Sequence, residues 1–240
     1  FAEYGYETIP CFTRAAGDGT VLVQEHAGED IAMVVAVGGD GTLNNTVSGI
    51  IRSKTDIPLG YIPLGSTNDF AASLELPKDI FSACEQIATG KPKSIDVGSF
   101  NGRYFVYIAC TGMFSEASYS TPQQLKNAFG HSAYLWKGLI SLKKMRFPVE
   151  TDSETIDGDF LFAAVSNTVR AGGIMWLPKK EIRFDDGFFE LTMVKAPEKI
   201  KDGTALVNDL IVSRVDTDNF IRKKVKRAVI RTEHKSGWSL

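Results

Sequence analysis

The segment from residue 31 to residue 54 constrains the fold more than any other part of the sequence. Residues 31–37 (IAMVVAV) are apolar at every position, which is typical of a parallel strand covered on both faces. Residues 38–41 (GGDG) interrupt this run, and residues 42–54 then place apolar side chains at helical spacing. A buried strand, a tight turn and a helix in this order predict an α/β layer with a parallel sheet.

The same order returns further along the chain. A short strand over residues 58–63 leads into a polar loop over 65–69 (GSTND) and a helix over 70–76. The pattern also predicts a strand over residues 6–12, a helix that begins at residues 17–20, and a helix over residues 79–89.

From about residue 92 the pattern changes to short strands separated by turns. Asn101-Gly102, the strongest short signal for a β-hairpin, joins the strands expected over 94–100 and 104–110. A helical insert with Leu125 and a helix over 134–145 follow, and further strands are expected over 160–165 and 188–194, around Val215, and over 225–230. The sequence therefore predicts an α/β N-terminal domain (residues 1–95) with a parallel sheet, followed by an antiparallel β-sandwich domain (96–240).

Composition excludes several classes of protein. The 27 basic and 29 acidic residues give a net charge of −2, which argues against a nucleic-acid partner. Cys11, Cys84 and Cys110 form no metal-binding spacing, and we interpret them as buried, reduced thiols of a cytoplasmic protein. No apolar run is long enough to cross a bilayer.

The glycine-rich loop is the first candidate for chemistry. Three glycines in four residues are costly unless backbone amides must approach a ligand, and the N-terminus of a helix favours an anion. The carboxylate of Asp40 would repel a bare phosphate, so we expect a cation or a transferable proton to share the site. The alternative is a strand-to-helix turn capped by Asp40 or Thr42.

The second polar loop, residues 65–69, also follows a strand and precedes a helix. Loops at the carboxyl ends of neighbouring parallel strands converge on one crevice, so Asp40 and Asp69 are expected to face one ligand. Taken alone, this loop is also compatible with an ordinary helix cap.

Together, VAVGGDGTLNNTVSGI (residues 35–50) and PLGSTNDFA (63–71) closely resemble the two signature loops of the diacylglycerol kinase catalytic domain, in its bacterial soluble lipid-kinase branch. Sphingosine and ceramide kinases, and more distantly NAD kinase, are related to this branch. The resemblance continues through IDVG (95–98), GHSAYLWKGL (130–139), VSN (165–167), AGG (171–173), FDDGFFEL (184–191) and GW (237–238).

This resemblance implies an ATP-dependent kinase that phosphorylates a lipid hydroxyl, most plausibly converting diacylglycerol to phosphatidic acid, in a cleft between the two domains. The positions that match the family's ATP site are Thr13, Gly38, Gly39, Asp40, Gly41, Thr42, Leu43, Asn44 and Ser66, and those that match its essential acidic residues are Asp40, Asp69 and Asp96. The family's structural Mg²⁺ would bind Asp186 and the carbonyls of Arg183 and Phe188. A plain Asp185-Asp186-Gly187 turn is the alternative at that site.

The family's general base, a glutamate in a DGE sequence after a tryptophan like Trp238, would lie beyond Leu240, and we expect the chain to be incomplete at both ends. An NAD kinase-like phosphotransferase and a non-catalytic nucleotide-binding module stay open as alternatives. Within the kinase reading, the role of Asp40 as metal organiser or proton acceptor is also open.

Two basic segments bear on membrane contact. The helix over 134–145 and the run RKKVKR (222–227) each suit either an anionic bilayer surface or an ordinary solvated element. The family's substrate implies peripheral contact with the inner face of the cell membrane. Formation of a homodimer is left open.

Overall fold

The computed structural model describes residues 1–112, 144–171, 175–212, 214–232 and 237–240. Its internal contacts divide the chain into two compact units, Phe1–Val106 and Tyr107–Leu240. The expected helical insert with Leu125, and most of the helix expected over 134–145, lie outside the described residues.

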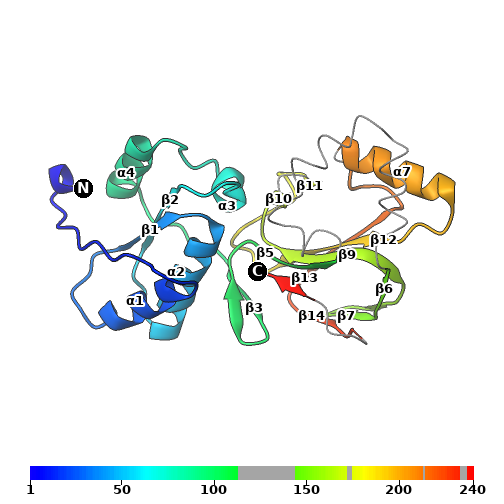
Figure 1. Cartoon of the computed structure of the whole chain (residues 1–240), viewed down its shortest axis with the longest axis horizontal. Coiled ribbons are helices and arrows are strands. Elements are labelled where there is room, and N and C mark those ends of the chain that lie inside the picture. The colour runs from blue at the N-terminus through cyan, green and yellow to red at the C-terminus, as the bar shows by residue number, and fades with distance from the viewer. Residues whose placement is uncertain (113–143, 172–174, 213, 233–236) are drawn as a thin grey trace. The chain divides into compact units, whose positions relative to one another are not determined.

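The first unit is an α/β layer around two parallel strands, with Val34 opposite Leu59 and Gly38 opposite Pro63. Figure 1 shows α1 and α2 on one side of these strands and α4 on the other. Its elements are η1 (Ala2–Tyr4), α1 (Asp18–His26), β1 (Val34–Gly38), α2 (Asp40–Ser53), β2 (Leu59–Pro63), α3 (Asp69–Ser73), α4 (Ile80–Thr89), β3 (Gly98–Phe100) and β4 (Arg103–Phe105).

Small residues allow the helices of this unit to pack closely. A Cβ atom on Gly49 of α2 would lie 2.6 Å from the Cβ of Val23 in α1, and one on Gly60 of β2 would lie 2.8 Å from Ile87 of α4. The apolar face of α2 is buried through Leu43, which is 1% exposed. This packing holds the first turn of α2 at the end of β1.

Two predictions for this unit are wrong. No strand forms over residues 6–12, which are mostly exposed, and Pro10 has no amide hydrogen to contribute to a ladder. The expected strand over 31–37 begins only at Val34, and Val37 is 52% exposed. Within residues 1–112 the strand pairs only with β2, so in this part of the chain it lies at the edge of a two-stranded sheet.

The second unit is built on a six-stranded sheet, ordered β13-β12-β9-β5-β15 with β6 also paired to β9, and these neighbouring strands are antiparallel. A three-stranded sheet (β14-β7-β8) and a two-stranded ribbon (β10-β11) accompany it. The elements are β5 (Ile108–Gly112), β6 (Met145–Arg146), β7 (Val149–Thr151), β8 (Thr155–Ile156), β9 (Asp159–Ser166), β10 (Arg170–Ala171), β11 (Met175–Trp176), β12 (Phe189–Lys195), α7 (Ile200–Ile211), β13 (Phe220–Val225), β14 (Ala228–Ile230) and β15 (Trp238–Ser239).

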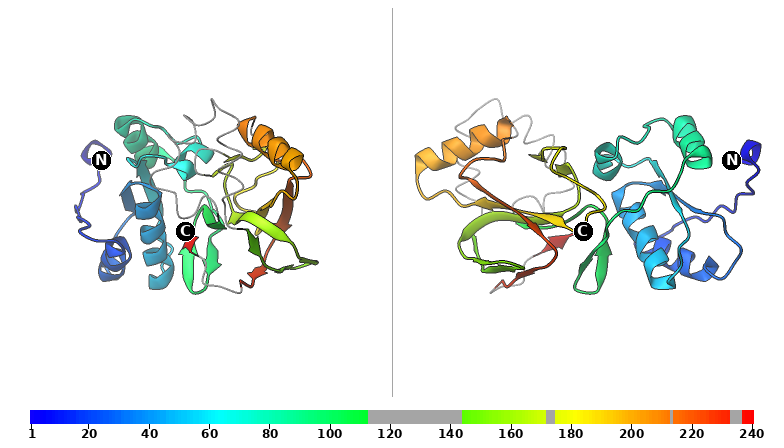
Figure 2. Two further views of the ribbon diagram at one scale, coloured as in Figure 1. Left: turned by 45° about the vertical axis from the view of Figure 1, so that its right-hand side comes forward. Right: turned by 180° about the vertical axis from the view of Figure 1, so that it is seen from behind.

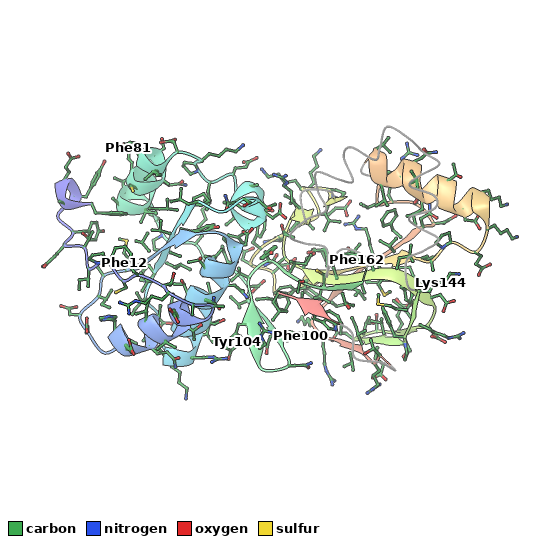
Figure 3. All side chains as sticks on the ribbon, in the orientation of Figure 1. Phe12, Phe81, Phe100, Tyr104, Lys144 and Phe162 are labelled. Atoms are coloured by element: carbon green, nitrogen blue, oxygen red, sulfur yellow. The ribbon has the colours of Figure 1, made fainter. Side chains whose placement is uncertain are left out.

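Two apolar clusters form the core of this unit. In one, Phe162 of β9, labelled in Figure 3, packs with Leu206 and Val207 of α7. In the other, Phe160 and Met193 pack with Val149 of β7. Figure 2 shows α7 lying over the six-stranded sheet. The structure thus confirms the expected α/β domain with a parallel sheet followed by an antiparallel sheet domain.

Some local predictions for this region need correction. The Asn101-Gly102 hairpin forms, with both residues at positive φ (48° and 79°), but its second strand ends at Phe105 instead of continuing to Cys110. The contact division falls after Val106, and the side chain of Asn44 in α2 bonds to the backbone around β4 within the first unit, while a domain boundary at residue 95 stays a prediction. Residues around Val215 form turns rather than a strand, and α7 was not anticipated.

Candidate functional site

The two polar loops leave the same ends of β1 and β2 and touch each other. The amide of Leu64 donates a hydrogen bond to the carbonyl of Gly38 at 2.8 Å, which extends the pairing of the strands into the loops. A Cβ atom on Gly39 would lie 3.2 Å from the Cα of Gly65. Backbone packs directly on backbone here, so glycine is required on both sides.

Asp40 joins the two loops through its side chain. It is the first residue of α2, and its carboxylate accepts hydrogen bonds from the amides of Asp69 (3.1 Å) and Phe70 (3.3 Å) at the start of α3. Burial raises the pKa of Asp40 above its ordinary value, while hydrogen bonds from the backbone of Asp69, Phe70 and Asn68 act in the opposite direction. Asp40 therefore connects one loop to the other instead of only capping its own helix.

Asn68 shapes the second loop. Its backbone is left-handed (φ 51°), a conformation that asparagine tolerates better than most residues. The side-chain oxygen accepts from the amide of Gly65 at 2.9 Å, and the side-chain nitrogen donates to the Gly65 carbonyl at 2.7 Å. The hydroxyl of Tyr61 donates to the same oxygen at 3.3 Å. Burial, and then the negative charge of Asp40, raise the pKa of Tyr61, so its hydroxyl stays protonated.

Tyr61 is a contributor to the site that the sequence did not reveal, because it lies in a strand whose residues read as ordinary core. Asn68 was noted only as a polar loop residue. An Asn that ends a GSTN loop before a helix is the available signal, since Asn is enriched at left-handed loop positions.

The three glycines of the first loop are explained to different degrees. A Cβ atom on Gly38 would lie 2.6 Å from Thr42 Oγ1, and Gly39 contacts Gly65. A Cβ atom on Gly41 would meet nothing within 4 Å, and the backbone of Gly41 is helical with no positive φ. The packing of the residues that the structure describes therefore gives no reason for glycine at position 41.

The other predicted nucleotide-binding residues fall into two groups. Thr13 and Ser66 are exposed, Thr13 on the irregular segment before α1 and Ser66 in the second loop. Leu43 and Asn44 are buried, and the amide group of Asn44 bonds to the carbonyl of Tyr104 and the amide of Val106, both at 3.1 Å. Leu43 and Asn44 can therefore contact a ligand only through their backbone.

The predicted acidic residues are also placed differently from one another. Asp69 is the first residue of α3 and is only 2% exposed, so its carboxylate lies inside the unit. Asp96 is half-buried on the segment between α4 and β3. The structure brings Asp40 together with Asp69 through the Asp69 amide, and a catalytic role for Asp69 and Asp96 stays a prediction.

The residues expected to bind a structural metal form a turn with a paired carboxylate. One oxygen of Asp186 accepts from the Phe188 amide at 3.1 Å, and the other lies 2.9 Å from Lys224 Nζ. Burial acts to raise the pKa of Asp186, but the bonds from Lys224 and Phe188 lower it overall. Among the described residues, no three His, Cys, Asp or Glu side chains converge as a metal-binding group. In the structure, the cation that contacts Asp186 is Lys224, and a Mg²⁺ ion bound by Asp186 and the carbonyls of Arg183 and Phe188 stays a prediction.

The second basic segment is largely compensated by partners. It lies mainly on β13, an edge strand of the six-stranded sheet, where basic side chains protect against pairing with other chains. Its contacts are Arg222 with Glu181 (3.0 Å), Lys223 with Glu154 (2.7 Å), Lys224 with Asp186 (2.9 Å), and Lys226 over the Phe188 ring (4.8 Å). This arrangement favours the solvated strand edge of the two interpretations.

Known proteins similar to this chain are diacylglycerol kinases. The family model of the diacylglycerol kinase catalytic domain matches residues 1–100. The chain is 33% identical over 239 residues to a diacylglycerol kinase of Bacillus subtilis, covering 98% of this chain and 78% of that protein. It is 36% identical over 196 residues to a diacylglycerol kinase of Staphylococcus aureus, covering 80% of this chain and 61% of that protein.

Among solved structures, a diacylglycerol kinase from Bacillus anthracis superposes with a TM-score of 0.71 at 23% identity, over 95% of this chain and 75% of that one. At this identity, the superposition establishes the fold. The fold and the sequence matches together define an ATP-dependent lipid kinase. The chain belongs to the diacylglycerol kinase family.

Proposed function

We propose that this kinase transfers the γ-phosphoryl group of ATP to the free hydroxyl of diacylglycerol and so forms phosphatidic acid. The names of its relatives from Bacillus subtilis and Staphylococcus aureus support this choice of acceptor. The structural observation that carries the proposal is the Asp40 carboxylate, which joins two loops from neighbouring strands at the N-terminus of α3.

ATP binds, in this proposal, at the first loop and the N-terminal turn of α2. The first amides of a helix have no acceptor within the helix, and its dipole favours phosphate. Gly41 supports this placement, because the chain itself has no need for a glycine there and a closely approaching ligand would. Gly38, Gly39 and Thr42 contribute backbone groups, and the exposed Thr13 and Ser66 contribute polar side chains. The amide of Leu43 already donates to the carbonyl of Gly39 at 3.1 Å, so Leu43 and Asn44 support the loop from within α2.

Mg²⁺ is proposed to accompany ATP at Asp40. The residue is half-buried and its carboxylate is held in place by two amides, and carboxylate oxygen is the ligand type that Mg²⁺ prefers. Mg²⁺ usually takes one or two protein carboxylates and completes its coordination with phosphate and water, so Asp40 suffices without a larger cluster. The bound ion would neutralise phosphate charge as it develops during transfer.

In the transfer step, the lipid hydroxyl oxygen forms a bond to the γ-phosphorus while the bond from that phosphorus to the leaving oxygen of ADP breaks, and a general base takes the proton of the hydroxyl. The chain contributes mainly orientation and electrostatic stabilisation, as is general for phosphoryl transfer. We assign Asp40 to organising the phosphates and their cation, because both of its oxygens already accept amide hydrogens. Asp69 and Asp96 are proposed as supporting acidic residues.

A metal at Asp186 is not part of the proposal. Lys224 already supplies positive charge to this carboxylate, and Lys226 lies over the adjacent Phe188 ring. We propose that the Lys224 ammonium supplies the positive charge beside Asp186 for which the family resemblance implies a structural Mg²⁺. No step of the proposed reaction involves a metal at Asp186.

The acceptor requires the protein to reach a lipid surface, and we propose peripheral contact at the inner face of the membrane. None of the helices in the described ranges is long and apolar enough to cross a bilayer. Two segments are candidates for contact with lipid headgroups. One is formed by the exposed basic side chains of residues 222–227, and the other is the helix expected over 134–145. A homodimer stays a prediction.

The proposal is tested by incubating the chain with labelled ATP and mixed micelles that carry one acceptor at a time. Diacylglycerol, monoacylglycerol and sphingosine are compared with NAD in solution. We expect labelled phosphatidic acid, and we expect Asp40→Ala to reduce its formation by about two orders of magnitude or more while the variant stays folded. Preferential phosphorylation of NAD, or full activity of folded Asp40→Ala, would contradict the proposal.

A further inference from the structure

A cysteine, a histidine and a glutamate lie in line at the surface of the first unit, apart from the two loops. Cys11 Sγ lies 3.7 Å from His26 Nε2, and His26 Nδ1 lies 2.9 Å from Glu29 Oε1. Cys11 is on the irregular segment before α1, His26 is the last residue of α1, and Glu29 follows in the next turn. A nucleophile, a base and a residue that orients the base are therefore consecutive contacts.

The contact with Glu29 determines how His26 acts on the thiol. An ionised carboxylate only accepts hydrogen bonds, so Nδ1 carries the proton and Nε2 presents its lone pair to the Cys11 thiol. Transfer of the thiol proton to Nε2 gives a thiolate beside an imidazolium.

The other two cysteines lack this arrangement. Cys110 is 7% exposed in β5, and burial raises the pKa of its thiol to about 11. Cys84 is partly buried on α4. Cys11 is exposed, so the expectation of a buried thiol is wrong for this residue, and it combines access to solvent with a neighbouring base. Reactive cysteines occur in such environments, and buried ones are inert.

We propose that Cys11 is an activated thiol that undergoes exchange with small disulfides, and that the adduct weakens ATP binding. In the exchange, Cys11 Sγ attacks one sulfur of the disulfide and forms a new S–S bond as the original S–S bond breaks. The second sulfur leaves as a thiolate and takes the proton held by His26. Cys11 is oxidised and the small disulfide is reduced, with one of its halves released as a thiol. The step therefore needs no other reactant.

The effect on ATP rests on the proposed function. Only Phe12, labelled in Figure 3, separates Cys11 from Thr13, the exposed residue assigned to nucleotide binding. The loop after Thr13 is held by Asp18, whose carboxylate accepts from the amides of Arg14 (2.6 Å) and Ala15 (2.8 Å). A mixed disulfide at Cys11 adds bulk at the entrance to this loop and would displace Thr13.

The test measures the rate at which each cysteine of the native protein reacts with dithiobis(nitrobenzoate), resolved by mass spectrometry of peptides. At neutral pH we expect Cys11 to react about tenfold faster than Cys84, and His26→Gln to remove most of that difference. Glu29→Gln should slow Cys11 by a smaller factor. Equal rates for Cys11 and Cys84, or an unchanged rate in His26→Gln, would overturn the assignment of an activated thiol.

The second arm measures ATP affinity before and after modification, with Cys11→Ser treated in parallel. We expect the adduct to weaken ATP binding at least several-fold in the wild-type chain and to have no effect on Cys11→Ser. Unchanged affinity of the modified wild type would refute the link to nucleotide binding. If the unmodified chain failed to bind ATP at all, the proposed function would fail, while the rate measurements would still decide the thiol chemistry.

Discussion

Gly41→Ala separates the contribution of a residue to folding from its contribution to ligand binding. A methyl group at this position meets nothing within 4 Å, and the backbone is that of the first turn of α2. Alanine is a better helix former than glycine by about 0.5–1 kcal/mol, so the variant should be more stable by up to that amount. For a chain of this length, that corresponds to a rise in melting temperature of roughly 1–4 °C.

The same methyl group should weaken ATP binding, because it lies where we place the phosphates against the helix amides. Loss of one hydrogen bond to a charged acceptor costs about 1.5–3 kcal/mol, which is roughly a tenfold to hundredfold weaker affinity. The assays are thermal unfolding of the ligand-free chain and a calorimetric titration with Mg-ATP.

Gly28→Ala is the matched control for Gly41→Ala. Gly28 also has open space around its Cα and no positive φ, but it lies in the turn after α1, outside the two loops. We expect unchanged ATP affinity in Gly28→Ala. If Gly41→Ala were more stable and bound ATP as tightly as the wild type, our interpretation of Gly41 as a ligand contact would be refuted. If Gly41→Ala were less stable than the wild type, the open space around the Cα of Gly41 would be refuted.

Three further predictions concern other parts of the chain. Gly65→Ala should destabilise the fold and abolish ATP binding together, because its Cβ atom would collide with Gly39 and lie 2.7 Å from Asn68 Oδ1; a stable variant that binds ATP would show that the loops are not in contact. Burial raises the pKa of Glu190 to about 7 from an ordinary value of 4.5, while the charge of Lys224 acts to lower it and that of Asp186 to raise it. Stability from the protonated form is complete below pH 4.5 and is lost as the pH rises through about 7, so urea unfolding should show this slope in the wild type and a flatter profile in Glu190→Gln. Mg²⁺ should leave the melting temperature of the ligand-free wild type unchanged, whereas Lys224→Met should gain a Mg²⁺-dependent stabilisation; a stabilisation already present in the wild type and lost in Asp186→Asn would instead favour a metal at that site.

The sequence predicted the outline of the site because the outline depends on local rules. A buried run followed by glycines and an amphipathic segment specifies a strand, a turn and a helix, and the ends of parallel strands bring successive loops together. The contacts of Gly38 with Thr42 and of Gly39 with Gly65 were not predictable, because they depend on the exact approach of two segments distant in the chain. The same holds for the amides of Asp69 and Phe70 that bind Asp40.

Errors occurred where tertiary contacts override local preference. Asp202-Gly203 has the composition of a turn, yet both residues lie in the first half of α7, which is held by the burial of Leu206 and Val207 in the sheet core. The Asp185-Asp186-Gly187 segment is compatible with a turn or a metal site in sequence, and the structure adds a contact between Asp186 and Lys224, on a neighbouring strand. No local pattern indicates that pairing.

Hydrogen–deuterium exchange of the wild-type chain, with and without Mg-ATP, tests most directly whether the two loops form one nucleotide site. Peptides that cover residues 38–44 and 64–69 should gain protection at the same ATP concentration, while peptides from β9 and β12 should be unaffected. Protection confined to one of the two loops, or absent from both, would contradict the account.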